Sequence, residues 1–541
     1  MKQIVFGFFL LTFGFLHSQA PSWQWALNGN CTTTDNGSAI TTDINGNVYT
    51  TGYFYGSNLT LGTTTIVNAG NYDVFISKHD NNGSFLWARK IGGAFDDVGN
   101  AITSDNSGNV FVCGYYTSNT LTIGSFTLNN LGGTDMFIAK YDPNGNVLWA
   151  KSFGDNMIEE ANAITCDGTN VYVTGQFQSN TINFGTGTLT CNGGGDVFIL
   201  KYDSNGNEIW GKSIGDAGLE IGYGITTSPG NDVFVTGSYR SANITFSTYT
   251  LTNNGGSDYF IARYNTAGNE IWAKGEGGNM DDAGTSVLVN SNGIYTTGSF
   301  RSTNISFGAT TFTNAAFTNA DVFLVNYNFS GNELWARAYG GNFDDIPYAL
   351  TADYAGNIFW GGHIHSTSVV MSTYTLNCAG VGDLFIAKTN LAGTLIWAEN
   401  IGGLQDEGIS GLASDLNGRI FATGFFNSSS VNFSSTALNN TGGADLFIAK
   451  LNNIPTNIQS PFSVLSNASL FPNPASSYAT IKNLPSNTSI RVTDLSGKEV
   501  LRYESSNESA FINVSDLPQG LYMVNLLSDN VNQTLKLSVL R

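Results

Sequence analysis

Seven acidic side chains recur at a fixed place along the chain, and carboxylates in a repeated position are candidate cation ligands. Each stands ten residues after a recurring tryptophan, and the set comprises Asp35, Asp97, Glu159, Glu220, Asp282, Asp345 and Glu407. Because Ca²⁺ prefers oxygen ligands, a ring of these carboxylates could bind calcium as a cofactor. We favour the alternative that each acid accepts backbone N–H groups in its own loop. A ligand site generally breaks the symmetry of a repeat, whereas these acids preserve it.

A second candidate site consists of basic side chains that do break the symmetry. His363 and His365 follow a recurring glycine in the sixth repeat, and Arg240 and Arg301 occupy the His365 position in the fourth and fifth repeats. Neighbouring repeats would place these side chains on one cationic arc, which could bind an anionic ligand such as a uronic or sulfated sugar. The two histidines share one side of a strand, so they could also form a weak metal site. Ordinary surface variation is the alternative.

Catalytic motifs are scarce in this chain. Only three histidines follow residue 20, namely His79, His363 and His365, and no nucleophile elbow, zinc-protease helix motif or phosphate-binding loop occurs. Two of the many carboxylates could act as a glycosidase pair, but sequence spacing does not measure their separation. We therefore expect a non-enzymatic binding or adhesion scaffold. The alternative is an extracellular carbohydrate-active hydrolase or lyase.

The elements that position these residues follow from an internal repeat of about sixty residues. Three markers each occur seven times. The tryptophans are Trp25, Trp87, Trp149, Trp210, Trp272, Trp335 and Trp397. An Asp-x-Phe motif begins at Asp73, Asp135, Asp196, Asp258, Asp321, Asp383 and Asp445. A glycine ends an apolar run at Gly52, Gly114, Gly175, Gly237, Gly298, Gly362 and Gly424.

One repeat predicts a meander of four strands. In the second repeat we expect strands at residues 101–105, 110–116, 135–141 and 147–153. Tight turns connect the first strand to the second and the third to the fourth, whereas longer connections alternate with them on the opposite face. Binding residues are usually displayed on long connections, so we expect function on that face.

The order of the markers predicts a closed ring. The chain begins with a tryptophan strand at Trp25 and ends its last repeat at Asp445, with no tryptophan strand after it. The first strand would complete the last sheet and leave no open edge. We therefore predict an all-β fold, a seven-bladed β-propeller over residues 21–453 that is closed by the N-terminal strand.

The repeats resemble those of the bacterial β-propeller repeat family, whose copies read roughly D-x-x-G-N-x-Y-x-T-G. Residues 43–52 (DINGNVYTTG) carry this pattern, and Ser228 and Asn290 replace its aspartate in two copies. The resemblance implies a propeller but no single activity.

After a predicted linker at residues 454–469, residues 470–541 alternate short strands with Gly and Pro turns, which predicts a small Ig-like β-sandwich. This segment resembles the C-terminal sorting domain of the type IX secretion system of Bacteroidota, the Por secretion tail. The motif residues that carry the resemblance are Pro472, Asn473, Pro474, Gly497, Lys498, Gly520 and Tyr522. The resemblance implies the secretion machinery as a partner and passage through the outer membrane of a Gram-negative cell, with release or attachment to the outer surface.

The remaining features agree with an exported protein. Residues 1–20 combine Lys2 with an apolar run too short to span a bilayer, as a signal peptide does, and no later segment is apolar enough to be transmembrane. A formal net charge of -19 argues against a nucleic acid partner and leaves an extracellular glycan or protein. The five cysteines are an odd number spread over the chain, so we expect small core or loop residues and not a disulfide framework.

Overall fold

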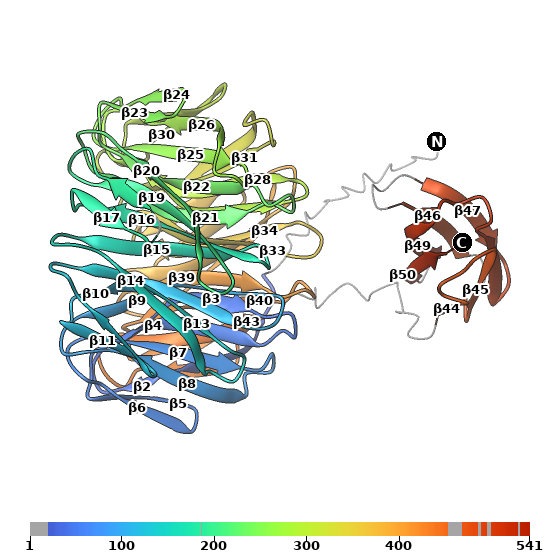
Figure 1. The fold of residues 1–541 in the computed structure, drawn as a ribbon, viewed down its shortest axis with the longest axis horizontal. Coiled ribbons are helices and arrows are strands. Elements are labelled where there is room, and N and C mark those ends of the chain that lie inside the picture. Colours follow the sequence, from blue (N-terminus) through green and yellow to red (C-terminus); the bar gives the residue numbers. More distant parts are fainter. Residues whose placement is uncertain are drawn as a thin grey trace, which may run out of the picture. The chain divides into compact units, whose positions relative to one another are not determined.

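The computed structural model describes residues 20–185, 187–452, 468–484, 488–494, 499–528 and 531–540. The predicted signal peptide lies outside these residues except for Ala20, as does most of the predicted linker. The chain divides into two compact units, residues 1–453 and 454–541. Every regular element in the described part is a strand (Figure 1). No helix there is long and apolar enough to span a bilayer.

The first unit contains seven four-stranded antiparallel sheets among its described residues. We number them 1 to 7 by their innermost strands, which are β3 (Asp35–Thr42), β9 (Asp97–Ser104), β15 (Glu159–Cys166), β21 (Glu220–Thr227), β27 (Asp282–Asn290), β33 (Asp345–Ala352) and β39 (Glu407–Ser414). The second strands are β4 (Val48–Phe54), β10 (Val110–Tyr116), β16 (Asn170–Phe177), β22 (Val233–Tyr239), β28 (Gly293–Phe300), β34 (Ile358–Ile364) and β40 (Ile420–Phe426). The third strands are β7 (Asp73–His79), β13 (Asp135–Tyr141), β19 (Asp196–Asp203), β25 (Asp258–Tyr264), β31 (Asp321–Tyr327), β37 (Asp383–Thr389) and β43 (Asp445–Leu451). The outermost strands of sheets 1 to 6 are β8 (Phe85–Ile91), β14 (Val147–Phe153), β20 (Glu208–Ile214), β26 (Glu270–Glu276), β32 (Glu333–Tyr339) and β38 (Leu395–Ile401).

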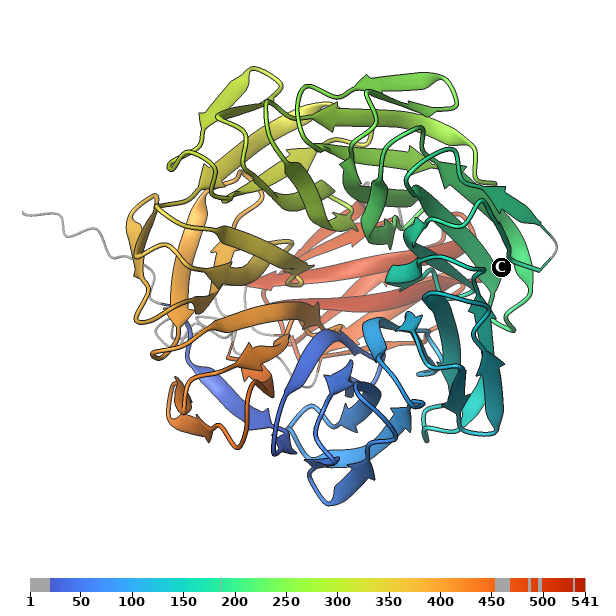
Figure 2. The same ribbon diagram turned by 90° about the vertical axis from the view of Figure 1, so that its left-hand side faces the viewer.

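These sheets are arranged radially around a central axis, as in a β-propeller (Figure 2). Each innermost strand packs against those of both neighbouring sheets, and β39 of sheet 7 packs against β3 of sheet 1. The apolar cores lie between adjacent sheets: one cluster combines Val74 and Ile76 of sheet 1 with Val110 and Val112 of sheet 2. Stacking therefore buries both faces of a sheet that could not bury them alone.

The N-terminal strand belongs to the last sheet. Strand β1 (Trp23–Asn28) pairs antiparallel with β43, so that Trp25 lies opposite Lys450 and Leu27 opposite Ile448. In Figure 2 this blue strand lies beside the orange strands of sheet 7. Sheet 7 is thus assembled from the two ends of the repeat region.

The recurring tryptophan connects neighbouring sheets. The indole N–H of Trp87 in sheet 1 donates a hydrogen bond to the carbonyl oxygen of Pro143, in a turn of sheet 2, at 3.1 Å. The same bond recurs from Trp149 to Ser204 at 3.2 Å and from Trp335 to Leu391 at 2.9 Å. Buried indole N–H groups need such a partner. Trp25, Trp210 and Trp272 make the same kind of bond, so the recurring tryptophan provides one hydrogen bond at six of the seven junctions between sheets.

The recurring glycine has a steric cause. The pairing of β9 with β10 shifts register between Cys113 and Gly114, which marks a β-bulge. At this point the two backbones approach so closely that a Cβ on Gly114 would lie 1.9 Å from the carbonyl oxygen of Val98. Because strand β9 continues past this bulge, it begins at Asp97 and not at the predicted residue 101.

The longer connection between the second and third strands contains a hairpin that the sequence analysis did not predict. The hairpins are β5 (Asn58–Leu61) with β6 (Thr64–Val67), β11 (Thr120–Ile123) with β12 (Phe126–Asn129), β17 (Thr181–Asn183) with β18 (Thr188–Thr190), β23 (Asn243–Phe246) with β24 (Tyr249–Thr252), β29 (Asn304–Phe307) with β30 (Thr310–Thr313), β35 (Ser368–Met371) with β36 (Tyr374–Asn377), and β41 (Ser430–Phe433) with β42 (Thr436–Asn439). The first of them also pairs with the short strand β2 (Asn30–Cys31).

The second unit contains two sheets. One consists of β44 (Ser469–Phe471), β45 (Tyr478–Lys482) and β48 (Ser509–Asn513), and the other of β46 (Thr488–Thr493), β47 (Glu499–Ser505), β49 (Gly520–Ser528) and β50 (Val531–Val539). Buried side chains of both sheets, among them Ile481, Ile512, Ile490 and Val524, form one apolar cluster. This unit therefore has a core of its own.

Candidate functional site

The seven recurring acids are buried at the start of the innermost strands. In sheets 2 to 7 each acid accepts hydrogen bonds from the loop before its strand and from the loop after the second strand, whereas Asp35 of sheet 1 accepts one from the backbone N–H of Leu446 in sheet 7. The carboxylate of Asp97 accepts hydrogen bonds from the backbone N–H of Gly93 at 2.6 Å and from the hydroxyl of Ser118 at 2.9 Å. Asp282 is held in the same way by Gly278 and Ser302, at 2.9 and 2.6 Å. This is the loop-binding role that the sequence analysis favoured. Calcium binding at these acids stays a prediction.

Burial raises the pKa of five of these carboxyls, namely those of Asp35, Asp97, Glu220, Asp282 and Asp345. It raises the pKa of Asp97 to about 7, with a further increase from the neighbouring Asp73 carboxylate, while hydrogen bonds from Ser118 and Gly93 lower it. Burial raises the pKa of Asp35 to about 8, against a lowering hydrogen bond from the backbone of Leu446. One oxygen of Asp97 and one of Asp73 accept no hydrogen bond from any described group. These carboxyls bind protons more tightly than exposed carboxyls do.

The cationic side chains that the sequence predicted on one arc are each paired with an aspartate of the following sheet. Arg301 makes two bonds to Asp344, at 2.8 and 3.0 Å. Arg240 lies 3.4 Å from Asp281, and the third pair is His365 with Asp406.

Carboxylates therefore lie beside three of the four basic side chains of the predicted anion site, and anion binding there stays a prediction. The sequence contains a signal for the pairing of these cations with aspartates. Each of these aspartates directly precedes a recurring acid, and each cation lies three residues after the recurring glycine of the preceding repeat.

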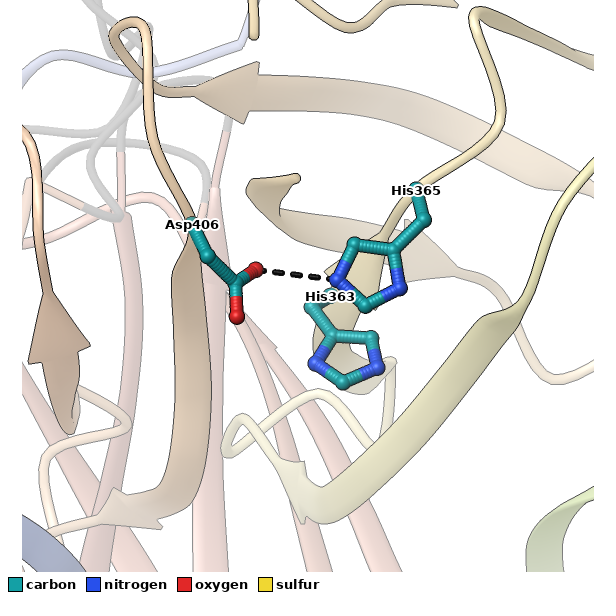
Figure 3. A group of neighbouring side chains, drawn as sticks. All are labelled: His363, His365 and Asp406. Carbon is teal, nitrogen blue, oxygen red and sulfur yellow. Dashed lines mark hydrogen bonds and ion pairs between the residues drawn. The ribbon is translucent and has the colours of Figure 1, made fainter. Parts of the chain in front are cut away.

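The two predicted histidines come together with Asp406 (Figure 3). The ring centroids of His363 and His365 are 4.3 Å apart, and His365 Nε2 lies 2.9 Å from Asp406 Oδ1. The Asp406 carboxylate raises the pKa of His365, whereas burial, with a contribution from His365, lowers the pKa of His363 to about 4. Both nitrogens of His363 lack a hydrogen-bond partner among the described groups.

A cavity of about 640 Å³ lies on the axis of the first unit, lined by side chains of all seven innermost strands and by His363. Its lining was not predicted from the sequence. The aromatic side chains in it are Tyr53, Tyr223, Tyr348 and Phe425. The amide side chains in it are Asn36, Asn100 and Asn162. The rings of Tyr223 and Tyr348 are 37% and 40% exposed, so they are open to a ligand.

The predicted motif residues of the second unit hold its last strands in place. Asn473 donates to the carbonyl oxygen of Lys536 at 2.6 Å and accepts from the backbone N–H of Ser538 at 2.8 Å. The hydroxyl of Tyr522 donates to the carbonyl oxygen of Pro518 at 2.8 Å. The other motif residues in the described part are Pro472, Pro474 and Gly520, whereas Gly497 and Lys498 lie outside it.

Comparison with known families identifies this unit. Residues 469–540 match the family model described as secretion system C-terminal sorting domain. This unit is a sorting domain of that family. The sorting domain indicates export by the type IX secretion system to the cell surface or the extracellular space, as predicted. In the first unit, residues 86–119 match the β-propeller repeat family, also as predicted.

Two further proteins match parts of this chain with low sequence identity. An uncharacterized WD repeat-containing protein of Acanthamoeba polyphaga mimivirus is 25% identical over 432 residues, which cover 63% of this chain and 31% of the viral protein. The regulatory protein FlaEY of Caulobacter vibrioides is 30% identical over 109 residues, which cover 20% of this chain and 11% of FlaEY. The matched regions thus span under a third of either relative.

Among solved structures, the WD40 propeller domain of Doa1 aligns with 79% of this chain and 96% of its own, at 10% identity and a TM-score of 0.38. PorZ, a surface component of the type IX secretion system of Porphyromonas gingivalis, aligns with 95% of this chain and all of its own, at 10% identity and a TM-score of 0.21.

Proposed function

We propose that this protein is an extracellular binding platform: a seven-bladed β-propeller, closed by its N-terminal strand, that a small Ig-like sorting domain delivers to the cell exterior. Support for the closed ring comes from the pairing of β1 with β43 and from the packing of β39 against β3. A closed ring holds its loops and its axial cavity rigid, which lowers the entropic cost of binding a ligand.

The observation that carries the binding role is the axial cavity. Its volume of about 640 Å³ falls in the range of small-molecule sites, and its combination of aromatic rings with a few polar groups is typical of them. The half-exposed side chains of Tyr223 and Tyr348 offer apolar faces, and the amide of Asn100 is a polar group of the same lining. A sugar ring presents apolar C–H faces and hydroxyl edges. We therefore assign the cavity to an uncharged segment of an extracellular glycan.

The test is binding of the secreted protein to an array of neutral oligosaccharides, followed by titration calorimetry on the best binder. Tyr223→Ala and Tyr348→Ala are each expected to weaken binding at least tenfold. Tyr354→Ala is the matched control, because Tyr354 is 90% exposed in a turn away from the cavity lining. Absence of binding, or binding that both cavity variants retain, would overturn the proposal.

The same samples test the enzymatic alternative, a carbohydrate-active hydrolase or lyase. Bound oligosaccharides are recovered and analysed for cleavage by mass spectrometry. Intact sugar supports the binding platform. Cleavage that is lost in the His365→Ala variant would show that the protein is an enzyme and not a binding platform.

A further inference from the structure

One side-chain cluster has the donor set of a transition-metal site. His363, His365 and Asp406 each offer one ligand atom, and these atoms all lie within 4.8 Å of one another. It is the only such group of three or more His, Cys, Asp or Glu residues in the described part of the chain. Strand β34 provides His363, His365 follows its end, and Asp406 comes from the loop that enters sheet 7 (Figure 3).

The buried ring of His363 keeps both of its nitrogens available to a ligand. The residue is only 9% exposed, and neither ring nitrogen has a hydrogen-bond partner among the described groups. A buried polar group without a partner costs about 1–3 kcal/mol. The ring is tilted by 32° to that of His365 and meets Tyr348 edge-on, with centroid separations of 4.3 and 5.3 Å. Neither contact satisfies a nitrogen lone pair.

The pairing of His365 with Asp406 does not by itself explain this arrangement. The equivalent pairs in the two preceding sheets, Arg301–Asp344 and Arg240–Asp281, use arginines in place of the histidine. Sheet 6 alone replaces the arginine with histidine and adds His363 two residues earlier, where sheets 4 and 5 carry Ser238 and Ser299. Each of these two differences places an imidazole, whose nitrogens can bind a metal ion, in sheet 6.

We propose that His363, His365 and Asp406 bind a divalent first-row transition metal ion, Zn²⁺ being the representative. Two imidazoles and one carboxylate are a common set for such ions, whereas Ca²⁺ and Mg²⁺ prefer oxygen ligands throughout. Tetrahedral zinc bonds of about 2.0–2.2 Å place the ligand atoms roughly 3.3 Å apart. The wider separations in the cluster, which reach up to 4.8 Å, must therefore shorten, whereas the 2.9 Å distance from His365 Nε2 to Asp406 Oδ1 widens slightly. Because His363 also lines the axial cavity, the proposed metal site adjoins that cavity.

The test is zinc binding by the secreted full chain after treatment with a chelator, in the absence of any sugar. Calorimetry against a competing chelator is expected to give one Zn²⁺ per chain, and Zn²⁺ is expected to raise Tm. Co²⁺ is expected to give the visible absorption of a histidine-ligated ion. Because no glycan is present, this outcome is independent of the proposed binding function.

Variants locate the site. His363→Ala and Asp406→Asn are each expected to lower zinc affinity at least tenfold and to abolish the rise in Tm. Asp281→Asn is the matched control, since it changes the equivalent aspartate of sheet 5 and should bind zinc as the parent does. Asp406 is partly exposed, so its variant keeps the experiment valid if His363→Ala fails to fold. No stoichiometric zinc, or unchanged affinity in both variants, would overturn the proposal.

Discussion

The indole N–H of Trp23 donates a hydrogen bond to Glu399 Oε1 at 2.8 Å, although the two residues are 376 positions apart in the chain. Trp23 lies in β1 of sheet 7 and Glu399 in β38 of sheet 6. The ring of Trp23 is 4% exposed and meets Phe433 edge-on at a centroid distance of 5.1 Å. The first strand therefore contacts sheet 6 as well as completing sheet 7.

Replacement of Trp23 should destabilise the whole first unit. Trp23→Ala removes a buried aromatic ring and is expected to lower the free energy of unfolding by about 3–5 kcal/mol. Trp23→Phe keeps most of the packing and loses the hydrogen bond, so a loss of about 1 kcal/mol is expected. Urea unfolding followed by tryptophan fluorescence measures both. Tyr354→Ala, at an exposed aromatic, should change stability by less than about 0.5 kcal/mol. Equal stability of Trp23→Ala and the parent would refute closure by the first strand.

Stability should fall as the pH rises from about 4 to about 8. Burial raises the folded-state pKa of Asp35 to about 8 and those of Asp97 and Glu399 to about 7. A carboxyl in the unfolded chain titrates near pH 4, so the folded state holds these protons more tightly. The stabilisation that these bound protons provide is fully present below about pH 4 and is lost as the pH rises through the folded-state pKa. Each unit of difference between the folded and unfolded pKa corresponds to about 1.4 kcal/mol.

The variant Asp35→Asn tests the contribution of one of these carboxyls to the pH dependence of stability. The amide cannot ionise, and its oxygen can still accept the 2.9 Å hydrogen bond from the backbone N–H of Leu446. Melting curves recorded across this pH range are expected to show a smaller loss of Tm for the variant than for the parent. Parallel curves would show that Asp35 does not bind its proton more tightly in the folded state.

The ion pairs between sheets should differ in strength. Arg301 binds Asp344 through two nitrogens and also donates to the carbonyl oxygen of Thr318 at 3.0 Å, whereas Arg240 meets Asp281 through one longer contact at 3.4 Å. Arg301→Ala is expected to cost about 1 kcal/mol and Arg240→Ala less than about 0.5 kcal/mol. A double-mutant cycle of Arg301 with Asp344 measures the coupling, which should weaken in about 1 M salt. A coupling energy of zero would show that the observed pair adds no stability.

Local rules predicted the sheets well because each marker has a local cause. The segments around Val110, Asp135 and Val147 form strands with the predicted bounds, since short runs rich in apolar and aromatic residues, bounded by tight turns, define them. The hairpins were missed because only three or four residues form each of their strands. Their signal was present: Leu121 and Ile123 alternate with threonines and are buried, and Gly124, with a φ of +58°, begins the turn after them.

The candidate site was less predictable because it joins residues from different sheets. His363 and His365 stood out by their departure from the repeat, but Asp406 follows them by more than forty residues and comes from the next sheet. The axial cavity combines side chains from all seven sheets, such as Tyr53 and Tyr348, and sequence spacing does not indicate which of them face the axis. Only the structure gives the distances between residues that belong to different sheets.

Deletion of residues 470–541 should stop secretion without unfolding the propeller. The two units have separate cores, so the truncated chain is expected to melt at the Tm of the first unit in the parent. Fractionation of cells should find it in the periplasm, because the sorting domain indicates export by the type IX system. Secretion of the truncated chain at the parent level would show that residues 470–541 are not the export signal.

Asn473 links a sorting motif to the integrity of the sorting domain. Its side chain bonds with both Lys536 and Ser538 of β50, at 2.6 and 2.8 Å, and so fixes the last strand against the segment that begins the domain. Asn473→Ala loses both bonds and is expected to lower the stability of the sorting domain by about 1–2 kcal/mol. Secretion should fall severalfold, as measured by immunoblotting of culture medium and periplasm, while the Tm of the propeller stays unchanged.

Further variants distinguish two roles of Asn473: stabilising the sorting domain and being recognised directly by the secretion machinery. Ser476→Ala, at an exposed position in the same loop, should be secreted as the parent is. Asn473→Asp keeps an acceptor for the backbone N–H of Ser538 but sets a carboxylate against the carbonyl oxygen of Lys536, so it should be as impaired as Asn473→Ala. If either Asn473 variant lost secretion while hydrogen exchange of β50 stayed at the parent rate, the machinery would read Asn473 directly. The bonds to β50 would then be incidental to export, since their loss would leave the strand as protected as before.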